Sequence, residues 1–268
     1  MSRHASELTD EQWSKIEPLI PKRKPSKKGG RKRVEDRRCF EGILWVLRSG
    51  ARWKDLPERH PSPATCWRRL QEWEDAGVWL DLWRKFLGEL DEEGILSWDE
   101  TFSDGTFSPA KKGGADIGKT KRGKGTKLMV VADGRGVPLG VRIAPASPAE
   151  VTLIESTLEQ VAVPRSGPGR PRTKPRRLIY DKAADSDALR LRLKKRGIEL
   201  ICPHRLNHKR PVLQDGRSLR RYRRRWTIER TVAWLGNFRR LVVRYERKSK
   251  MFLAFLKVAC LMITLRQF

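Results

Sequence analysis

The apolar residues of this chain change their spacing once, close to residue 90, and this change limits the folds open to the sequence. Before it, apolar residues recur at intervals of three and four, which is typical of amphipathic helices. After it, short apolar runs bounded by Gly, Pro and Asp predict strands. We therefore expect an all-α domain over residues 1–90 and an α/β domain over residues 91–268.

Three helices are predicted in the first domain. The first begins after Thr9, a residue type that favours the N-cap position. The second lies within residues 34–50, and the third begins at Ser62 or Pro63 and ends at Gly77. The buried face of the first helix is expected to consist of Trp13, Ile16, Leu19 and Ile20.

Basic residues in this domain suit contact with DNA. Arg68 and Arg69 lie on the third expected helix, and residues 21–33 are rich in Lys, Pro and Gly, which predicts a solvated basic loop. Three short helices joined by turns fit a helix-turn-helix DNA reader, and they fit a generic helical bundle equally well. The tryptophans of the domain are expected in its core: Trp45, Trp53, Trp67, Trp73, Trp79 and Trp83.

The second domain predicts a mixed sheet with helices around it. The order of its elements is hairpin, helix, strand, helix, strand, helix. A turn at residues 133–136 divides the hairpin. Strands are expected within residues 95–107, 127–144, 176–181 and 198–203, helices within 147–163 and 184–197 and from about residue 222 onward, and a basic loop over 164–177.

The composition favours a polyanionic partner. The chain has 59 lysines and arginines against 32 acids, a formal charge of +27, so nucleic acid is favoured over a membrane surface. The longest apolar run, residues 251–265, is interrupted by Lys257 and is too short to span a bilayer. No signal-peptide pattern begins the chain, so we expect a cytoplasmic protein. Cys39, Cys66, Cys202 and Cys260 are scattered, and we expect buried free thiols rather than a zinc site.

Three acids are candidates for chemistry on DNA. Enzymes that cut and rejoin phosphodiesters commonly use two divalent cations about 4 Å apart, held by oxygen donors. Asp104 lies in the first expected strand, and Asp181 lies at the carboxyl end of another, where open α/β sheets bind ligands. Glu229 lies on a helix, and Arg225 and Tyr222 fall on the same helical face at four and seven residues before it.

Other acids have competing interpretations. Asp99 and Glu100 compete with Asp104 as metal ligands, because they precede it in the same segment. Asp185 and Asp187 precede an expected helix and are interpreted as capping or charging its N-terminus. Asp133 is interpreted as a turn residue.

Two further alternatives concern Glu229 and the histidines. Glu229 could form only a surface ion pair with Arg225 or Arg230, which contributes little to stability. His204 and His208 have the spacing of a metal pair, but they lie in a basic loop with no third ligand. We interpret both as facing phosphate or solvent.

Taken together, these motifs resemble the DDE transposases of insertion sequences, in the insertion-sequence-five group. Tyr222-x-x-Arg225-x-x-x-Glu229 matches the signature around the family's third acid. Residues 103–114 and 179–190 resemble the segments that carry the first and second acids. Residues 118–133 resemble the Lys- and Gly-rich approach to the second strand, and the N-terminal helical segment also resembles that of the group.

The resemblance departs from the family at one position. A basic residue is usual about two turns after the third acid, but Gly236 occupies that place, and Arg239 and Arg240 are the expected substitutes. The interval between Asp181 and Glu229 is also too short for the large inserted domain of some related transposases.

The resemblance implies a ribonuclease-H-like catalytic domain behind a helix-turn-helix-like DNA-binding domain. It implies that Asp104, Asp181 and Glu229 are catalytic and bind two Mg²⁺ or Mn²⁺ ions. The partners would be terminal inverted repeats and target DNA, bound by a homodimer at the bacterial nucleoid. The residues expected to contact DNA or phosphate are Tyr222, Arg225, Lys111, Lys112, Lys119, Lys121, Arg122, Lys124, Arg68, Arg69, Arg239 and Arg240. A non-catalytic DNA-binding derivative and a magnesium nuclease without strand transfer are the alternatives.

Overall fold

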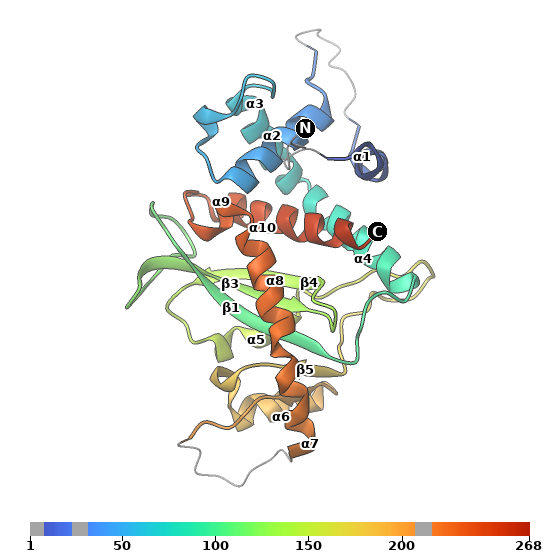
Figure 1. The fold of residues 1–268 in the computed structure, drawn as a ribbon, viewed down its shortest axis with the longest axis vertical. Coiled ribbons are helices and arrows are strands. Elements are labelled where there is room, and N and C mark those ends of the chain that lie inside the picture. The colour runs from blue at the N-terminus through green and yellow to red at the C-terminus, as the bar shows by residue number, and fades with distance from the viewer. Residues whose placement is uncertain (1–7, 23–31, 207–215) are drawn as a thin grey trace.

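The computed structural model describes residues 8–22, 32–206 and 216–268, and the statements below concern these residues. Helices α1 to α4 precede a six-stranded mixed sheet, and the sheet's later strands are interleaved with helices α5 and α6 and followed by α7 to α10 (Figure 1). The mixed α/β fold predicted from the sequence, with its helical N-terminal region, is therefore confirmed. The division into domains at residue 90 stays a prediction.

The N-terminal helices are α1 (Asp10–Ile16), α2 (Asp36–Ser49), α3 (Pro63–Asp75) and α4 (Val78–Glu92). Thr9 caps α1 through a reciprocal bond with Gln12, and Ser62 caps α3 by accepting the N–H of Thr65. The prediction of only three helices was wrong, because Gly77 adopts a left-handed conformation that ends one helix and immediately allows another. Leu19, at 38% exposed, does not share the buried face of α1.

The sheet has the strand order β2-β3-β1-β5-β6, with β4 paired to β3. Strand β3 runs antiparallel to its three neighbours, whereas β1, β5 and β6 are mutually parallel. The short strand β2, which the sequence pattern did not predict, pairs with the start of β3. The strands are β1 (Thr101–Pro109), β2 (Gly118–Thr120), β3 (Gly123–Ala132), β4 (Pro138–Pro145), β5 (Arg177–Ile179) and β6 (Glu199–Ile201).

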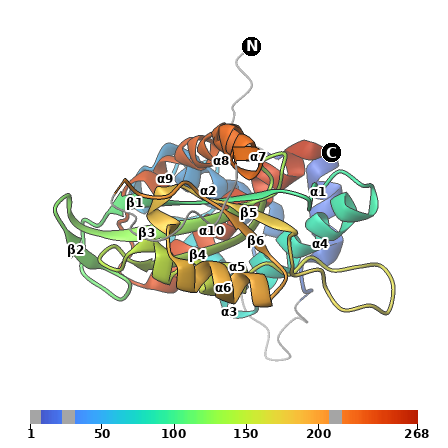
Figure 2. The same ribbon diagram turned by 90° about the horizontal axis from the view of Figure 1, so that it is seen from below.

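Helices cover both faces of this sheet. Helix α8 lies on β1 and β3, while α5 contacts β3 and β4 and α6 contacts β6 (Figure 2). The helix expected within residues 147–163 is shorter than predicted, because a 3-10 turn at Glu150–Thr152 precedes α5. The remaining helices are α5 (Ile154–Leu158), α6 (Asp187–Lys195), α7 (Gly216–Arg220), α8 (Trp226–Gly236), α9 (Arg239–Val242) and α10 (Ser249–Thr264).

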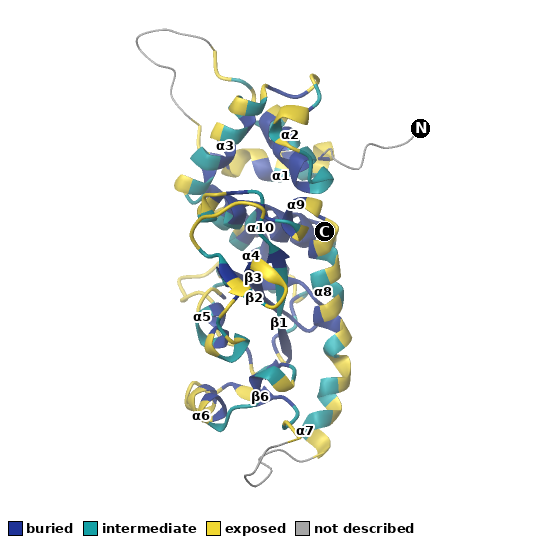
Figure 3. Cartoon of the chain, turned by 90° about the vertical axis from the view of Figure 1, so that its left-hand side faces the viewer, coloured by how far each residue is buried: buried dark blue, intermediate teal, exposed yellow. Residues whose placement is uncertain are grey.

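Helix α10 joins the N-terminal helices to the sheet. It packs against α3 and α4 on one side and β4 on the other, and buried residues run from α2 through α10 into the sheet as one core (Figure 3). Lys257, which interrupts the apolar run of α10, forms a buried ion pair with Glu74 at 2.6 Å. None of the described helices is long and apolar enough to cross a membrane.

The expected tryptophan core is confirmed for three of its six residues. Trp73, Trp79 and Trp83 are buried, whereas Trp45, Trp53 and Trp67 are only partly buried against the core. All four cysteines are free and buried, as predicted.

Candidate active site

Asp104 lies in the middle of β1, at the place where β1 extends beyond its parallel neighbour. Strand β5 pairs with β1 only as far as Phe102 and Ile179, so the chain that leaves β5 passes beside Asp104. The Oδ1 atom accepts the N–H of Gly105 at 2.8 Å. Burial raises the pKa of Asp104 to about 6; the nearby charges of Glu150 and Asp181 also raise it, while the Gly105 N–H and Arg225 act in the opposite direction.

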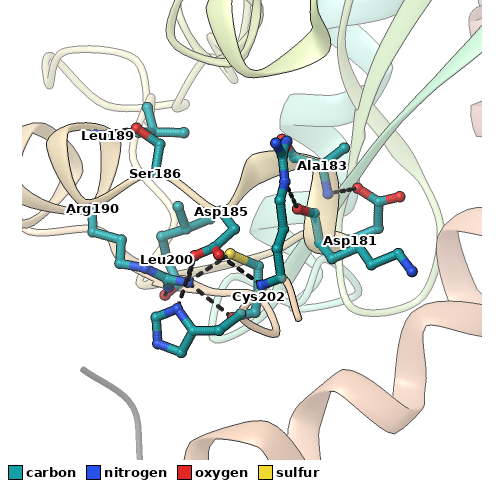
Figure 4. Close-up of polar contacts among 11 residues, drawn as sticks. Asp181, Ala183, Asp185, Ser186, Leu189, Arg190, Leu200 and Cys202 are labelled. Atoms are coloured by element: carbon teal, nitrogen blue, oxygen red, sulfur yellow. Dashed lines mark hydrogen bonds and ion pairs between the residues drawn. The ribbon is translucent and has the colours of Figure 1, made fainter. Parts of the chain in front are cut away.

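Asp181 follows the carboxyl end of β5. Its Oδ1 atom accepts the N–H of Ala183 at 2.7 Å, and this bond caps the 3-10 turn Lys182–Ala184 and fixes the direction of the carboxylate (Figure 4). Its charge acts on both Asp104 and Arg225. The structure therefore brings the first two predicted acids to the same edge of the sheet.

Arg225 connects these acids to α8. Its Nη2 atom is 3.2 Å from Oδ2 of Asp104 and 3.8 Å from Oε1 of Glu229, and its Nη1 donates to the Tyr222 hydroxyl at 3.3 Å. Burial alone would lower the pKa of Arg225, but the bond to Tyr222 and the charges of Asp104 and Asp181 leave it raised. Tyr222, Arg225 and Glu229 thus share one face, as their spacing predicted.

Glu229 approaches the sheet less closely than the other two acids. Its side chain is 62% exposed, and among the described residues it forms an ion pair with Arg225. Among the described residues, no group of three or more His, Cys, Asp or Glu side chains is close enough to enclose a metal ion. The donor set still fits a hard divalent cation, because such ions prefer carboxylate oxygens. The raised pKa of Asp104 comes first from its burial, and the charges of Glu150 and Asp181 add smaller contributions.

The competing acids have other partners. Asp99 is exposed and lies 3.8 Å from Arg176, and Glu100 pairs with Arg221 at 2.9 Å and Arg224 at 2.6 Å. Asp133 is buried and accepts the N–H groups of Arg135 and Val137 across the hairpin turn, and that of Ser97 outside it, so its interpretation as a turn residue is confirmed.

Six of the predicted phosphate-binding residues lie on one exposed stretch. We call residues 118–124, which comprise β2 and the turn into β3, the basic arm; Figure 2 shows β2 at the periphery of the molecule. No ion pair joins any of the six to another residue in the described part of the chain. They are Lys111 and Lys112, just before the arm, and Lys119, Lys121, Arg122 and Lys124 within it, and all six are exposed.

Two predicted phosphate contacts are corrected by their burial. Arg69 is 4% exposed, pairs with Asp36 and donates to the carbonyl of Val34. Arg240 is 5% exposed and pairs with Glu246 at 2.7 Å. Both guanidinium groups therefore stabilise the interior, whereas their neighbours Arg68 and Arg239 are exposed.

Comparison with known proteins places this fold in a family. Residues 92–264 match the family model described as "Transposase DDE domain", and residues 8–83 match the model described as "Putative transposase of IS4/5 family (DUF4096)". The chain belongs to the DDE transposase family. The resemblance inferred from the sequence motifs is confirmed at this level.

Similar proteins come from an insertion element of Burkholderia cepacia. The transposase is 39% identical over 117 residues to "Insertion element IS402 uncharacterized 16.2 kDa protein", a match that covers 42% of this chain and 80% of that one. It is 37% identical over 140 residues to "Putative transposase for insertion sequence element IS402", covering 52% of this chain and 62% of that one. A solved structure, the piggyBac transposase synaptic complex with hairpin DNA, shares the fold at 10% identity, with a TM-score of 0.54 over 97% of this chain and 72% of that one.

The sequence interpretation of this transposase missed the role of Asp185. Its side chain is almost fully buried and accepts bonds from Arg190 at 3.0 Å and from the N–H of Arg205 at 2.8 Å (Figure 4). His204 lies 2.9 Å from the same carboxylate, so the prediction that His204 faces phosphate or solvent was wrong. Ser186 caps α6 in place of Asp185, and His208 lies outside the described residues.

The second missed residue is Glu150, in the 3-10 turn after β4. Its Oε2 atom accepts the Tyr180 hydroxyl at 2.8 Å, directly before Asp181 in the chain. Burial, followed by the charge of Glu150, raises the pKa of Tyr180, so the hydroxyl stays a donor. The sequence carries no motif around Glu150, and only its contact across the sheet identifies it.

Proposed function

We propose that this transposase binds the terminal inverted repeats of its insertion element and cleaves and rejoins DNA, using Asp104, Asp181 and Glu229 in a ribonuclease-H-like catalytic domain. The observation that carries the proposal is the meeting of Asp104 and Asp181 at one sheet edge, with Arg225 between them and Glu229. Membership of the DDE family supports the reaction class.

The three acids would hold two divalent cations, Mg²⁺ or Mn²⁺. When bound, such ions lower the pKa of an attacking water or 3′-hydroxyl and stabilise the leaving oxygen. The protein's own contribution is to keep the Asp104 and Asp181 carboxylates fixed by backbone N–H bonds, so that little reorganisation is needed. The side chain of Glu229 is exposed on α8, and it would complete the cation site from that helix.

Arg225 and Tyr222 would hold a DNA phosphate beside the acids. The Nε atom of Arg225 is buried and has no hydrogen-bond partner among the described residues, although its two Nη atoms are engaged. A guanidinium group matches phosphate geometry well, so Arg225 suits a phosphate beside the acids. The Tyr222 hydroxyl would donate to the same phosphate.

The N-terminal helices and the basic arm would supply the remaining DNA contacts. Helix α3 would act in the manner of a helix-turn-helix reader with Arg68 exposed, and the arm would track the DNA backbone. The fold is shared with a transposase solved with hairpin DNA, which supports DNA as the partner. Two transposon ends must be held together for strand transfer, so we propose a homodimer on DNA.

An assay with labelled terminal repeats and Mg²⁺ or Mn²⁺ tests the function. We expect nicks at the repeat ends and joined products with target DNA. Glu229→Gln should reduce cleavage at least about 10³-fold while it preserves DNA binding, because the amide cannot replace the carboxylate as a cation ligand. The matched control is Glu159→Gln, an exposed glutamate at the end of α5, which should cut normally.

The outcomes separate the alternatives. DNA binding without nicks from the unmodified protein would indicate a non-catalytic derivative, and nicks without joined products would indicate a nuclease. Full cleavage by Glu229→Gln would show that the third acid is assigned wrongly.

A further inference from the structure

A fourth carboxylate lies against both strands that carry the sheet acids. Glu150 is in the 3-10 turn that follows β4, and its Oε2 accepts the hydroxyl of Tyr180 at 2.8 Å. Tyr180 is fully buried and is the residue immediately before Asp181. Glu150 is thereby bound to the chain segment that presents the second acid.

The same carboxylate lies beside the first acid's strand. A Cβ atom at Gly105 would lie 2.7 Å from both the Cδ and Oε1 atoms of Glu150, which is too close for real atoms. Gly105 therefore provides the space in which the carboxylate approaches the backbone next to Asp104. The approach brings two like charges together: the charge of Glu150 acts on Asp104, and it acts there more strongly than that of Asp181.

Among the described residues, the charge of Glu150 has one long ion pair, with Lys127. The nearest ammonium, Lys127 Nζ, is 3.9 Å from Oε1 and donates instead to the carbonyl of Pro148 at 2.6 Å. The Glu150 side chain is only 23% exposed. A glutamine would accept the Tyr180 bond equally well, so packing alone does not require an acid at a position where its charge opposes Asp104.

We propose that Glu150 is a fourth acid of the cation site, whose negative charge beside Asp104 and Asp181 strengthens the binding of divalent cations. The inference rests on the proposed function, because it assumes that the acids bind cations. Glu150 acts on the reaction through the metal affinity of the other acids and is therefore a positioning residue. Removal of the Glu150 charge should therefore have two effects of different size. The metal concentration required for cleavage should rise strongly, whereas the rate at saturating metal should fall only slightly.

The direct test is a titration of the full-length protein with Mn²⁺, in which electron paramagnetic resonance counts the free ion. Glu150→Gln keeps an acceptor for Tyr180 and removes the charge, and it should weaken Mn²⁺ binding about tenfold or more. Cleavage by this variant should need correspondingly more Mg²⁺, with most of the rate restored at saturation. Unchanged Mn²⁺ affinity in the folded variant would overturn the proposal.

Three variants separate charge from structure. Tyr180→Phe removes the hydrogen bond and keeps the charge, so it should bind Mn²⁺ with nearly normal affinity. Glu150→Asp keeps the charge and should recover most of the affinity that Glu150→Gln loses. Glu155→Gln removes a charge on α5 that already pairs with Arg192 at 2.7 Å, and it should have no effect. Equal losses in Glu150→Gln and Tyr180→Phe would indicate a merely structural role and overturn the proposal.

Two further variants keep the test decisive. If Glu150→Gln fails to fold, Lys127→Met tests the same idea with the opposite sign, since removal of the nearby ammonium should tighten Mn²⁺ binding about threefold. Weaker binding by Lys127→Met would overturn the proposal. Asp181→Asn should lose Mn²⁺ binding and cleavage together. Normal Mn²⁺ binding by Asp181→Asn would contradict the proposed function itself. If Asp181→Asn loses Mn²⁺ binding while Glu150→Gln binds Mn²⁺ normally, only the role of Glu150 is overturned.

Discussion

The buried arginines and the basic arm use the same positive charge in opposite ways. Arg240 and Arg244 are inside the protein, where Arg240 pairs with Glu246 and Arg244 donates to the Thr126 hydroxyl and to backbone carbonyls. The cations of residues 118–124 are exposed and pair with no acid among the described residues. The basic residues behind the net charge of +27 therefore include buried, paired side chains and exposed, unpaired ones. Only the exposed, unpaired side chains are available to a phosphate backbone.

The difference follows from the cost of burial. A guanidinium group taken out of water must recover its hydration from fixed partners, so each buried arginine comes with a set of acceptors. An exposed cation keeps its hydration and gains by releasing the counterions of DNA. The number of protein partners around a basic residue thus predicts whether its loss affects stability or DNA binding.

The largest expected effect is on the buried side of this comparison. Arg240→Met leaves the Glu246 carboxylate buried without its ion pair, and both side chains of the pair are 6% exposed. We expect a loss of about 3–5 kcal/mol in the free energy of unfolding, because the remaining charge is uncompensated. Urea denaturation followed by tryptophan fluorescence measures this loss.

The neighbouring Arg239→Met is the matched control, since Arg239 is exposed. Its stability should change by less than about 0.5 kcal/mol. Equal stability of the two variants would contradict the stabilising role of the buried Arg240. Much weaker DNA binding by folded Arg240→Met than by the unmodified protein would contradict it as well.

The next effect is on the arm. Replacement of Lys119, Lys121, Arg122 and Lys124 by glutamine should leave the melting temperature unchanged, because these side chains pair with no described acid. DNA affinity should fall on the order of 10²–10³-fold at 0.1 M salt, and the slope of log K against log salt should fall by about 3–4. Fluorescence anisotropy of a labelled duplex at several salt concentrations measures both quantities.

The control for the arm is a variant in which four exposed cations are replaced elsewhere in the protein. Arg192, Lys194, Lys195 and Arg196 lie on and just after α6, and Arg192 already pairs with Glu155. Their replacement by glutamine should reduce the slope much less. An equal reduction would mean that the arm has no special role and that affinity depends on net charge alone.

Local patterns predicted what depends on neighbours in the sequence. The caps at Thr9 and Ser62, the hairpin turn at Asp133 and the shared face of Tyr222, Arg225 and Glu229 all follow from the spacing of a few residues. The position of Asp104 within a strand and of Asp181 after a strand end followed from local patterns in the same way.

Local sequence patterns did not predict contacts between segments that are distant in the chain. Arg68 and Arg69 are adjacent arginines that no local pattern distinguishes. Arg69 is the buried one because it bonds to Asp36 and Val34, more than thirty residues away. Glu150 is close to Gly105 and Tyr180 because the fold brings the turn that follows β4 back to β1 and to the end of β5, which no local pattern encodes. The buried ion pairs and the fourth acid could therefore be identified only from the tertiary structure.

Arg68 and Arg69 provide the smallest and most local test, because adjacent residues fall on opposite sides of the comparison. Arg68→Gln removes one exposed cation from α3, so the slope of log K against log salt should fall by about 0.9 while stability stays within about 0.5 kcal/mol. Arg69→Gln should instead destabilise the protein, because it leaves Asp36 without its buried partner. An unchanged slope in Arg68→Gln would mean that this face of α3 does not lie on DNA, and the DNA-reading surface would then have to be sought on another N-terminal helix.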